Sequence, residues 1–248
     1  MSTPLHKTKG IVLRVTKYGE TSLIALIYTE QFGIQSYLIQ GVRNGGVKKA
    51  YQANYFQPGA LLDLVVYHHE QQTLQRIKEY KWHYIYCSLM QDVIKNSILL
   101  YIIEVATKTI KQPETNPDLF AFMEEAIIWL DKCDTAEAAN FPIYFNLHFS
   151  SFFGFQMTND SNEKNIVLDL VNGKFLSEIA HHSQCYEGDI IPLLKELIRV
   201  MHPDELTEIS LNRTKRQEML DLLEKYYSIH LPEFGKLKTL PIIKQLMN

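Results

Sequence analysis

The segment of residues 41–55 brings cations and aromatic rings close together. It reads GVRNGGVKKAYQANY, where the cations are Arg43, Lys48 and Lys49 and the first tyrosine is Tyr51. Lysine and arginine neutralise phosphates whatever the base sequence, and a tyrosine face can stack on an unpaired base. These residue types predict a contact surface for nucleic acid. The alternative is a flexible connection between two strands, with tyrosines that cover the end of a barrel.

A second group of cations lies in the sequence Asn-Arg-Thr-Lys-Arg at residues 212–216, where Arg213, Lys215 and Arg216 stand at a predicted helix start. Positive charge is unfavourable at a helix N-terminus, and a bound anion would relieve it. The alternative is a solvated cluster that salt screens. We therefore keep two interpretations, an anion site and an ordinary charged surface.

Motifs for bond chemistry are incomplete. The run GVRNGGVK at 41–48 resembles a phosphate-binding loop, but Val47 stands where the lysine must follow the second glycine. The run HEQQT at 69–73 begins like a zinc-protease helix, but Thr73 replaces the second histidine. The sequence has no G-x-S-x-G or G-x-G-x-x-G motif. It therefore predicts a protein that is not an enzyme and has no cofactor.

The best metal candidates are His181, His182 and Cys185. They lack an obvious fourth ligand, because the other cysteines, Cys87 and Cys133, are far away in the sequence and no C-x-x-C occurs. A disulfide framework is excluded on the same grounds. We expect a polar loop without metal.

The composition is that of a globular protein. Among 248 residues, 46% are hydrophobic and 21% are charged, and the net charge is −3. No apolar run is long enough to span a membrane, and the start MSTPLHKTKG lacks a signal-peptide core, so we expect a cytoplasmic protein. Residues 1–80 contain nine Lys/Arg and five Asp/Glu, whereas residues 81–248 contain 16 and 23. A basic part followed by an acidic part indicates a polyanion ligand for the first.

The elements that must position these residues also change near residue 80. Before it, short β-rich runs alternate with turn residues, and in residues 61–67 apolar side chains recur at every second position. Five short strands in this length predict a closed barrel of the OB type. The expected strands are Gly10–Val15, Ser22–Thr29, Ile34–Gln40, Leu61–Tyr67 and Thr73–Tyr80.

After residue 80 the apolar spacing becomes helical. Asn116 is the expected N-cap of a helix with Pro117 in its first position, Ile98 to Ile103 predict a helix that is apolar on every side, and Thr214 to Gln217 predict a capping box. Further helices are expected at Phe141–Phe153, Asp189–Met201, Thr214–Ile229 and Thr239–Met247. The fold class is therefore α+β with several domains: a five-stranded OB-fold barrel at 1–80, then an α-helical bundle at 81–248 with a small hairpin excursion at about 157–183.

Short motifs in a fixed order resemble the bacterial recombination mediator and DNA repair family RecO. They span nearly the whole chain. In order they are GIVLR (10–14), YGETS (18–22), TEQFG (29–33), GVR (41–43), NFP (140–142), FGF (153–155), YYSIHLP (226–232) and LKTL (237–240).

The resemblance implies a nucleoid-associated protein that binds single- and double-stranded DNA and anneals complementary strands. It also implies two partners, RecR and the acidic C-terminal tail of the single-stranded-DNA-binding protein SSB. Family members often carry a four-cysteine zinc site in the excursion, but residues 157–183 contain no cysteine, so we expect a metal-free hairpin.

We expect the DNA contacts to lie on the barrel, whereas the second cation group would bind DNA or the SSB tail. The expected DNA-binding residues are Arg14, Lys17, Arg43, Lys48, Lys49 and Tyr51. Two alternatives stay open: an RNA-binding OB-fold protein, and a helical scaffold for protein interactions.

Overall fold

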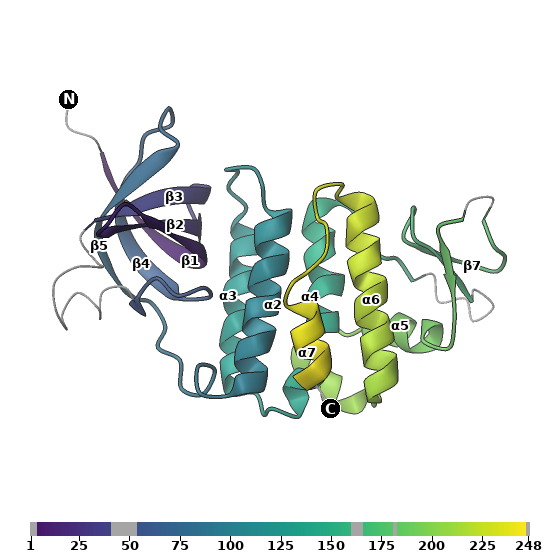
Figure 1. Ribbon diagram of the computed structural model, residues 1–248. Helices are drawn as coiled ribbons and strands as arrows, with labels where there is room; N and C mark the ends of the chain where they lie inside the picture. Colours follow the sequence, from purple (N-terminus) through teal and green to yellow (C-terminus); the bar gives the residue numbers. More distant parts are fainter. Residues whose placement is uncertain (1–3, 41–53, 160–165, 181–182, 247–248) are drawn as a thin grey trace. The chain divides into compact units, whose positions relative to one another are not determined.

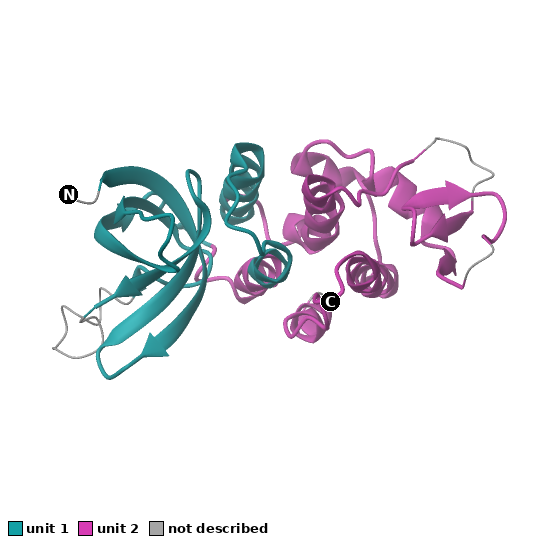
Figure 2. Cartoon of the chain, turned by 90° about the horizontal axis from the view of Figure 1, so that it is seen from above, with its two compact units in different colours: residues 1–88, 103–131 teal, residues 89–102, 132–248 magenta. Residues whose placement is uncertain are grey.

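The computed structural model describes residues 4–40, 54–159, 166–180 and 183–246. Backbone contacts divide the chain into two compact units (Figure 2). Unit 1 comprises residues 1–88 and 103–131, and unit 2 comprises residues 89–102 and 132–248. The domain boundary near residue 80 stays a prediction, and the last barrel strand ends at Trp82.

Unit 1 contains the expected five-stranded barrel, which is closed in the order β1-β2-β3-β5-β4 (Figure 1). The strands are β1 (Leu5–Tyr18), β2 (Ser22–Thr29), β3 (Gly33–Ile39), β4 (Leu61–Tyr67) and β5 (Leu74–Trp82). All neighbours are antiparallel except β3 and β5, which are parallel. Strand β1 is longer than expected because its first part pairs with β4 and its second part with β2, which closes the barrel.

The barrel core follows from the alternation in β4. Leu62, Leu64 and Val66 point inward and are at most 2% exposed, while Asp63 and Val65 point outward. The same period in the other strands completes one apolar cluster. Its members are Val12, Leu23, Ala25, Ile27, Tyr37, Ile39, Phe56, Ala60, Leu62, Leu64 and Val66.

One helix of unit 1 covers part of the outer barrel surface. This helix, α3 (Pro117–Lys132), begins where expected, because the Asn116 side chain accepts a hydrogen bond from the Leu119 amide at 2.9 Å. The ring of Phe120 lies 5.8 Å from that of Tyr28 on β2. The Tyr28 hydroxyl also donates to the Asn116 carbonyl at 3.2 Å. These contacts attach the start of α3 to the barrel.

The turn between β2 and β3 approaches the start of α3 very closely. Gly33 has φ = +60°, and a Cβ atom there would lie 2.3 Å from the carbonyl oxygen of Glu114. Both the backbone angle and the space therefore require glycine.

Helix α2 (Val93–Thr109) runs through both units. The expectation of a stretch that is apolar and buried on every side is wrong at one position, because Leu100 is 39% exposed. Hydrophobic residue type alone does not specify whether a particular turn of a helix is covered.

Unit 2 contains the remaining helices and a small sheet in the order β7-β6-β8. Its third strand, β8, lies beyond the expected excursion at 157–183, and helix α4 ends earlier than expected, before a 3-10 turn that stops at Gly154. None of the described helices is long and apolar enough to cross a membrane. The elements are η1 (Glu137–Asn140), α4 (Phe141–Phe149), η2 (Ser150–Phe153), β6 (Val167–Asp169), β7 (Lys174–Leu176), β8 (Cys185–Glu187), α5 (Ile191–Leu197), η3 (Pro203–Glu208), α6 (Arg213–His230) and α7 (Leu240–Leu246).

Helix α6 begins two residues earlier than the predicted capping box requires. Its N-cap is Asn212, whose side-chain oxygen accepts a hydrogen bond from the Lys215 amide at 2.9 Å. The prediction of Thr214 and Gln217 as a capping box is therefore wrong. Asparagine is among the strongest N-cap residues, and here its side chain accepts the hydrogen bond of the Lys215 backbone N–H, which has no partner within the helix.

Candidate nucleic-acid interface

Two rows of outward-facing residues cross four strands of the barrel. Strand pairing aligns one residue from each strand in each row. In order across β1, β2, β3 and β5, the rows are Arg14, Leu26, Ser36, Leu74 and Thr16, Ile24, Leu38, Arg76. We call these eight residues the open face. OB folds bind oligonucleotides on the outer face of their second and third strands and on the adjoining loops. Here these strands are β2 and β3.

The open face has a cation at two diagonal corners and aliphatic side chains between them. Arg14 and Arg76 are exposed, whereas Ile24, Leu26 and Leu38 are half-buried. Among the residues that the structure describes, neither arginine forms an ion pair. The arrangement therefore offers two uncompensated positive charges and an apolar surface for bases.

The second expected cation of β1 does not share this face. Lys17 pairs with Leu23, which points into the barrel core, so Lys17 lies on the opposite side of the strand from Arg14. Lys17 is exposed at the end of the barrel where Leu23 also pairs with Ile39, the last residue of β3. The other expected DNA-binding residues, Arg43, Lys48, Lys49 and Tyr51, lie outside the described residues.

A cleft adjoins the open face beside β5 and has a volume of about 540 Å³. We call it the β5 cleft. It combines one cation, aromatic rings, amides and aliphatic side chains, and it shares three residues with the open face. Its lining residues are Leu38, Tyr67, His69, Gln72, Leu74, Gln75 and Arg76.

The wall of the β5 cleft is the turn between β4 and β5, and one buried side chain holds it. Gln75 is 1% exposed. Its amide nitrogen donates to the carbonyl oxygens of His69 at 2.7 Å and Gln72 at 2.6 Å, and its amide oxygen accepts from the His69 backbone N–H at 3.0 Å. The turn is therefore fixed by three hydrogen bonds to a residue of the barrel interior.

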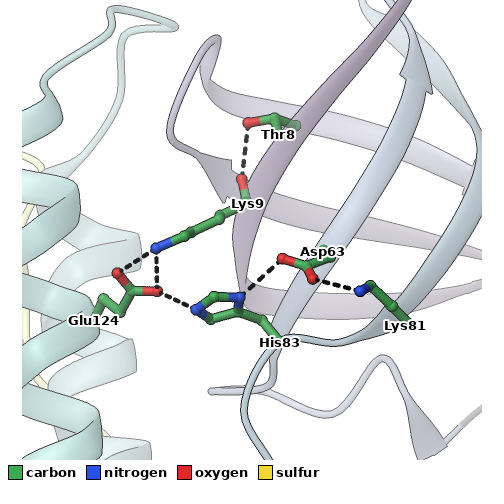
Figure 3. Close-up of polar contacts among 6 residues, drawn as sticks. All are labelled: Thr8, Lys9, Asp63, Lys81, His83 and Glu124. Carbon is green, nitrogen blue, oxygen red and sulfur yellow. Dashed lines mark hydrogen bonds and ion pairs between the residues drawn. The ribbon is translucent and has the colours of Figure 1, made fainter.

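Two other cations of the barrel, Lys9 and Lys81, form ion pairs with carboxylates (Figure 3). The Lys9 ammonium lies 3.0 Å from a carboxylate oxygen of Glu124 on α3, and that of Lys81 lies 3.2 Å from Asp63. The two ring nitrogens of His83 face Asp63 at 2.8 Å and Glu124 at 2.9 Å. These lysines are poor candidates for phosphate contacts, because binding an anion there would break an existing ion pair.

Sequence reasoning did not identify Arg76 and Gln75. The expected strand at residues 73–80 contained both, but strand identity alone does not say which strands are neighbours. Arg76 belongs to the open face only because β5 pairs with β3, a parallel partner distant in the sequence. The sequence offered no clear signal for Gln75, because its neighbours are Leu74 and Arg76 and the residues two positions away are Thr73 and Ile77.

The cation group of unit 2 is divided between surface and interior. Arg213 is exposed and Lys215 half-buried, but Arg216 is 8% exposed. Its Nε donates to the side-chain oxygen of Asn140 and its Nη2 to the Leu211 carbonyl, both at 3.0 Å. Burial lowers the pKa of Arg216. The surface part of this group therefore consists of Arg213 and Lys215, and its role in binding an anion stays a prediction.

The expected absence of metal is not tested at its centre, because His181 and His182 lie outside the described residues. Cys185 begins β8. Within the described ranges, no three His, Cys, Asp or Glu residues are arranged to hold a metal ion.

Comparison with known proteins identifies the family. The family model described as recombination protein O N terminal matches residues 1–86, and the model described as recombination protein O C terminal matches residues 90–241. The DNA repair protein RecO of Bacteroides fragilis is 34% identical over 98% of this chain and 100% of its own length. The proteins of the same name from Phocaeicola vulgatus and Flavobacterium psychrophilum are 31% and 33% identical, again over 98% of this chain. The chain therefore belongs to the recombination protein O (RecO) family of DNA repair proteins.

Proposed function

We propose that this protein is a recombination mediator that binds single- and double-stranded DNA on its barrel and anneals complementary strands. The observation that carries the proposal is the open face, where Arg14 and Arg76 have no ion-pair partner among the described residues and flank aliphatic side chains. A strand of DNA that follows the outer surface across β1, β2, β3 and β5 can place one phosphate at each arginine, while the aliphatic residues between them contact bases.

Annealing requires no bond chemistry in this proposal. Two DNA strands repel each other through their phosphates, and cations on one protein surface reduce that repulsion when both strands bind. The proposal therefore needs neither a catalytic residue nor ATP. We further expect Arg43, Lys48 and Lys49 to contact phosphates and Tyr51 to contact a base.

The direct experiment replaces the two arginines of the open face. The double variant Arg14→Ala/Arg76→Ala should bind single-stranded DNA more weakly at every base sequence. The slope of log affinity against log salt should become shallower by about 0.7 for each lost phosphate contact. A titration by fluorescence anisotropy at several salt concentrations measures both quantities, and a strand-annealing assay should show a parallel loss.

The matched control is Lys78→Ala, because Lys78 is on the same strand as Arg76 but pairs with Glu79 at 3.5 Å. Its removal should leave the slope unchanged. If the double variant is folded and binds like the unaltered protein, the open face is not the DNA site. The variant Arg43→Ala/Lys48→Ala/Lys49→Ala then tests the loop in the same titration, and Tyr51→Ala should weaken binding without changing the slope.

We further propose that the protein acts with RecR and SSB to load recombinase on SSB-coated DNA. Arg213 and Lys215 are the accessible cations for the acidic SSB tail. Annealing of SSB-coated strands, measured with and without RecR, tests this step. Replacing both cations by alanine should reduce annealing of coated strands and leave annealing of bare strands unchanged. Equal affinity for RNA and DNA of the same sequence would instead favour an RNA-binding protein.

A further inference from the structure

We propose that Gln75 is a positioning residue that shapes the β5 cleft to admit one unpaired nucleotide, so that this part of the barrel selects single strands over duplex. The inference rests on the proposed DNA-binding function and deepens it. It concerns the turn of residues 68–73, which forms one wall of the β5 cleft and which Gln75 holds from inside the barrel.

Gln75 occupies an unusual position, because its polar side chain is buried in the barrel. An amide group in a barrel core is costly unless all of its hydrogen-bonding atoms are satisfied. Here the partners are backbone atoms of His69 and Gln72, at 2.6–3.0 Å, and the turn also closes on itself through a hydrogen bond from the Gln72 N–H to the His69 carbonyl at 3.1 Å. The side chain therefore specifies the conformation of a surface turn rather than the packing of the core.

The residues that line the β5 cleft match the chemical groups of a nucleotide. Arg76 supplies an exposed cation for one phosphate, Tyr67 supplies an aromatic ring, and Leu38 and Leu74 supply an apolar floor. No acidic residue lines the cleft among the residues that the structure describes. A volume of about 540 Å³ is within the usual range for a small-molecule pocket, so it has room for a base with its sugar.

Single-stranded and duplex DNA differ in which of their groups can enter the β5 cleft. In a duplex the bases are stacked and paired, so a cleft of this size meets only the backbone, whereas an unpaired base can leave the stack and enter. A wall that is already fixed before binding loses less conformational entropy when a nucleotide enters. Gln75 therefore increases affinity for single strands and has little effect on duplex.

The test compares three DNA probes on the full chain: oligodeoxythymidine, a strand of the same length without bases, and a duplex. The unaltered protein should prefer the thymidine strand to the baseless strand, because bases contact both the β5 cleft and the open face. Gln75→Leu should reduce this preference by about fivefold to about 150-fold, the range for stacking one base, while its affinities for the baseless strand and the duplex stay the same. A folded Gln75→Leu variant that keeps the full preference overturns the proposal.

Two further variants separate positioning from general damage. Gln35 also fastens a turn, since its amide nitrogen donates to the Phe32 carbonyl at 2.8 Å, but it does not line the β5 cleft. Gln35→Leu should therefore keep the preference. If Gln75→Leu does not fold, Leu38→Ser alters the cleft floor from outside the barrel and should reduce the same preference. An unchanged preference in folded Leu38→Ser also overturns the proposal.

The outcomes distinguish this inference from the function on which it rests. If the unaltered protein binds none of the three probes, the proposed DNA-binding function fails. If it binds all of them without preferring the thymidine strand to the baseless strand, DNA binding stands and the nucleotide site in the β5 cleft is wrong.

Discussion

The barrel has cations that are paired with a carboxylate and cations that are not, and Asp63 is the carboxylate of one such pair. Burial by itself raises the pKa of this carboxyl group, but hydrogen bonds from Lys81 and His83 and their charges outweigh burial, and the pKa lies below its ordinary value of 3.8. Lys81 is therefore already paired with a carboxylate of the same protein. Arg14 and Arg76 lack such partners among the described residues, so a phosphate meets no competing carboxylate there.

The lowered pKa of Asp63 predicts a pH dependence of stability. A carboxyl group whose pKa is lower in the folded state stabilises the fold above its unfolded pKa, and this contribution disappears as the pH falls through the folded value. Unaltered protein should therefore be more stable than Asp63→Asn near neutral pH, with a difference that shrinks below about pH 4. Urea unfolding at a series of pH values measures it.

The effect at Asp63 should be small, because its side chain is 36% exposed and solvent screens its ion pairs. Lys78→Ala serves as the control, since the Lys78–Glu79 pair is exposed on both sides. A stability difference between unaltered protein and Asp63→Asn that stays constant across the acidic range would contradict the assignment of the shift to these partners.

At the scale of elements, one buried arginine joins two helical segments of unit 2. Arg216 on α6 donates to Asn140, the last residue of η1, and Asn140 donates to the Ile209 carbonyl at 3.0 Å. These residues fix the start of α6 against the start of α4. The polar link explains why Arg216 points inward while its neighbour Arg213 stays in solvent.

This link predicts the result of a pair of substitutions. Asn140→Ala should lower the free energy of unfolding by about 1–3 kcal/mol, because it removes one of the two hydrogen-bond acceptors of the buried Arg216 guanidinium and the side-chain donor to the Ile209 carbonyl. Arg213→Ala should change stability by less than about 0.5 kcal/mol, since this side chain is exposed. Chemical denaturation of both variants checks the contrast, and equal stabilities would refute the structural role of Asn140.

Over the whole molecule, a basic first part of the chain is followed by an acidic remainder. From the predicted division into a barrel and a helical bundle we expect a particular pattern of proteolysis. The first cuts should fall within residues 41–51 or 157–183, which are polar and contain glycine or asparagine, rather than within the apolar stretch Ile98–Ile103 of α2. Mass spectrometry of a limited digest identifies the sites. Early cleavage between Ile98 and Ile103 would contradict the assignment of this stretch to a stable helix.

Features that depend on neighbouring residues could be predicted from the sequence. The period of two predicted five strands, the apolar helical spacing predicted the bundle helices, and Asn116 followed by Pro117 predicted the start of α3. Each of these signals acts within one or two turns of backbone, so it is readable without knowledge of distant contacts. The order of short motifs likewise indicated the RecO family.

Which side chains share a surface depends on contacts between segments that are distant in the sequence. Val12 points into the barrel, and simple alternation would place Arg14 beside it, but a bulge between them shifts the register and turns Arg14 outward. Arg76 joins the same face through the pairing of β5 with β3, and Arg216 turns inward because Asn140, 76 residues away, accepts its hydrogen bond. Strand register and burial depend on how distant segments close against each other, and no local pattern encodes that closure.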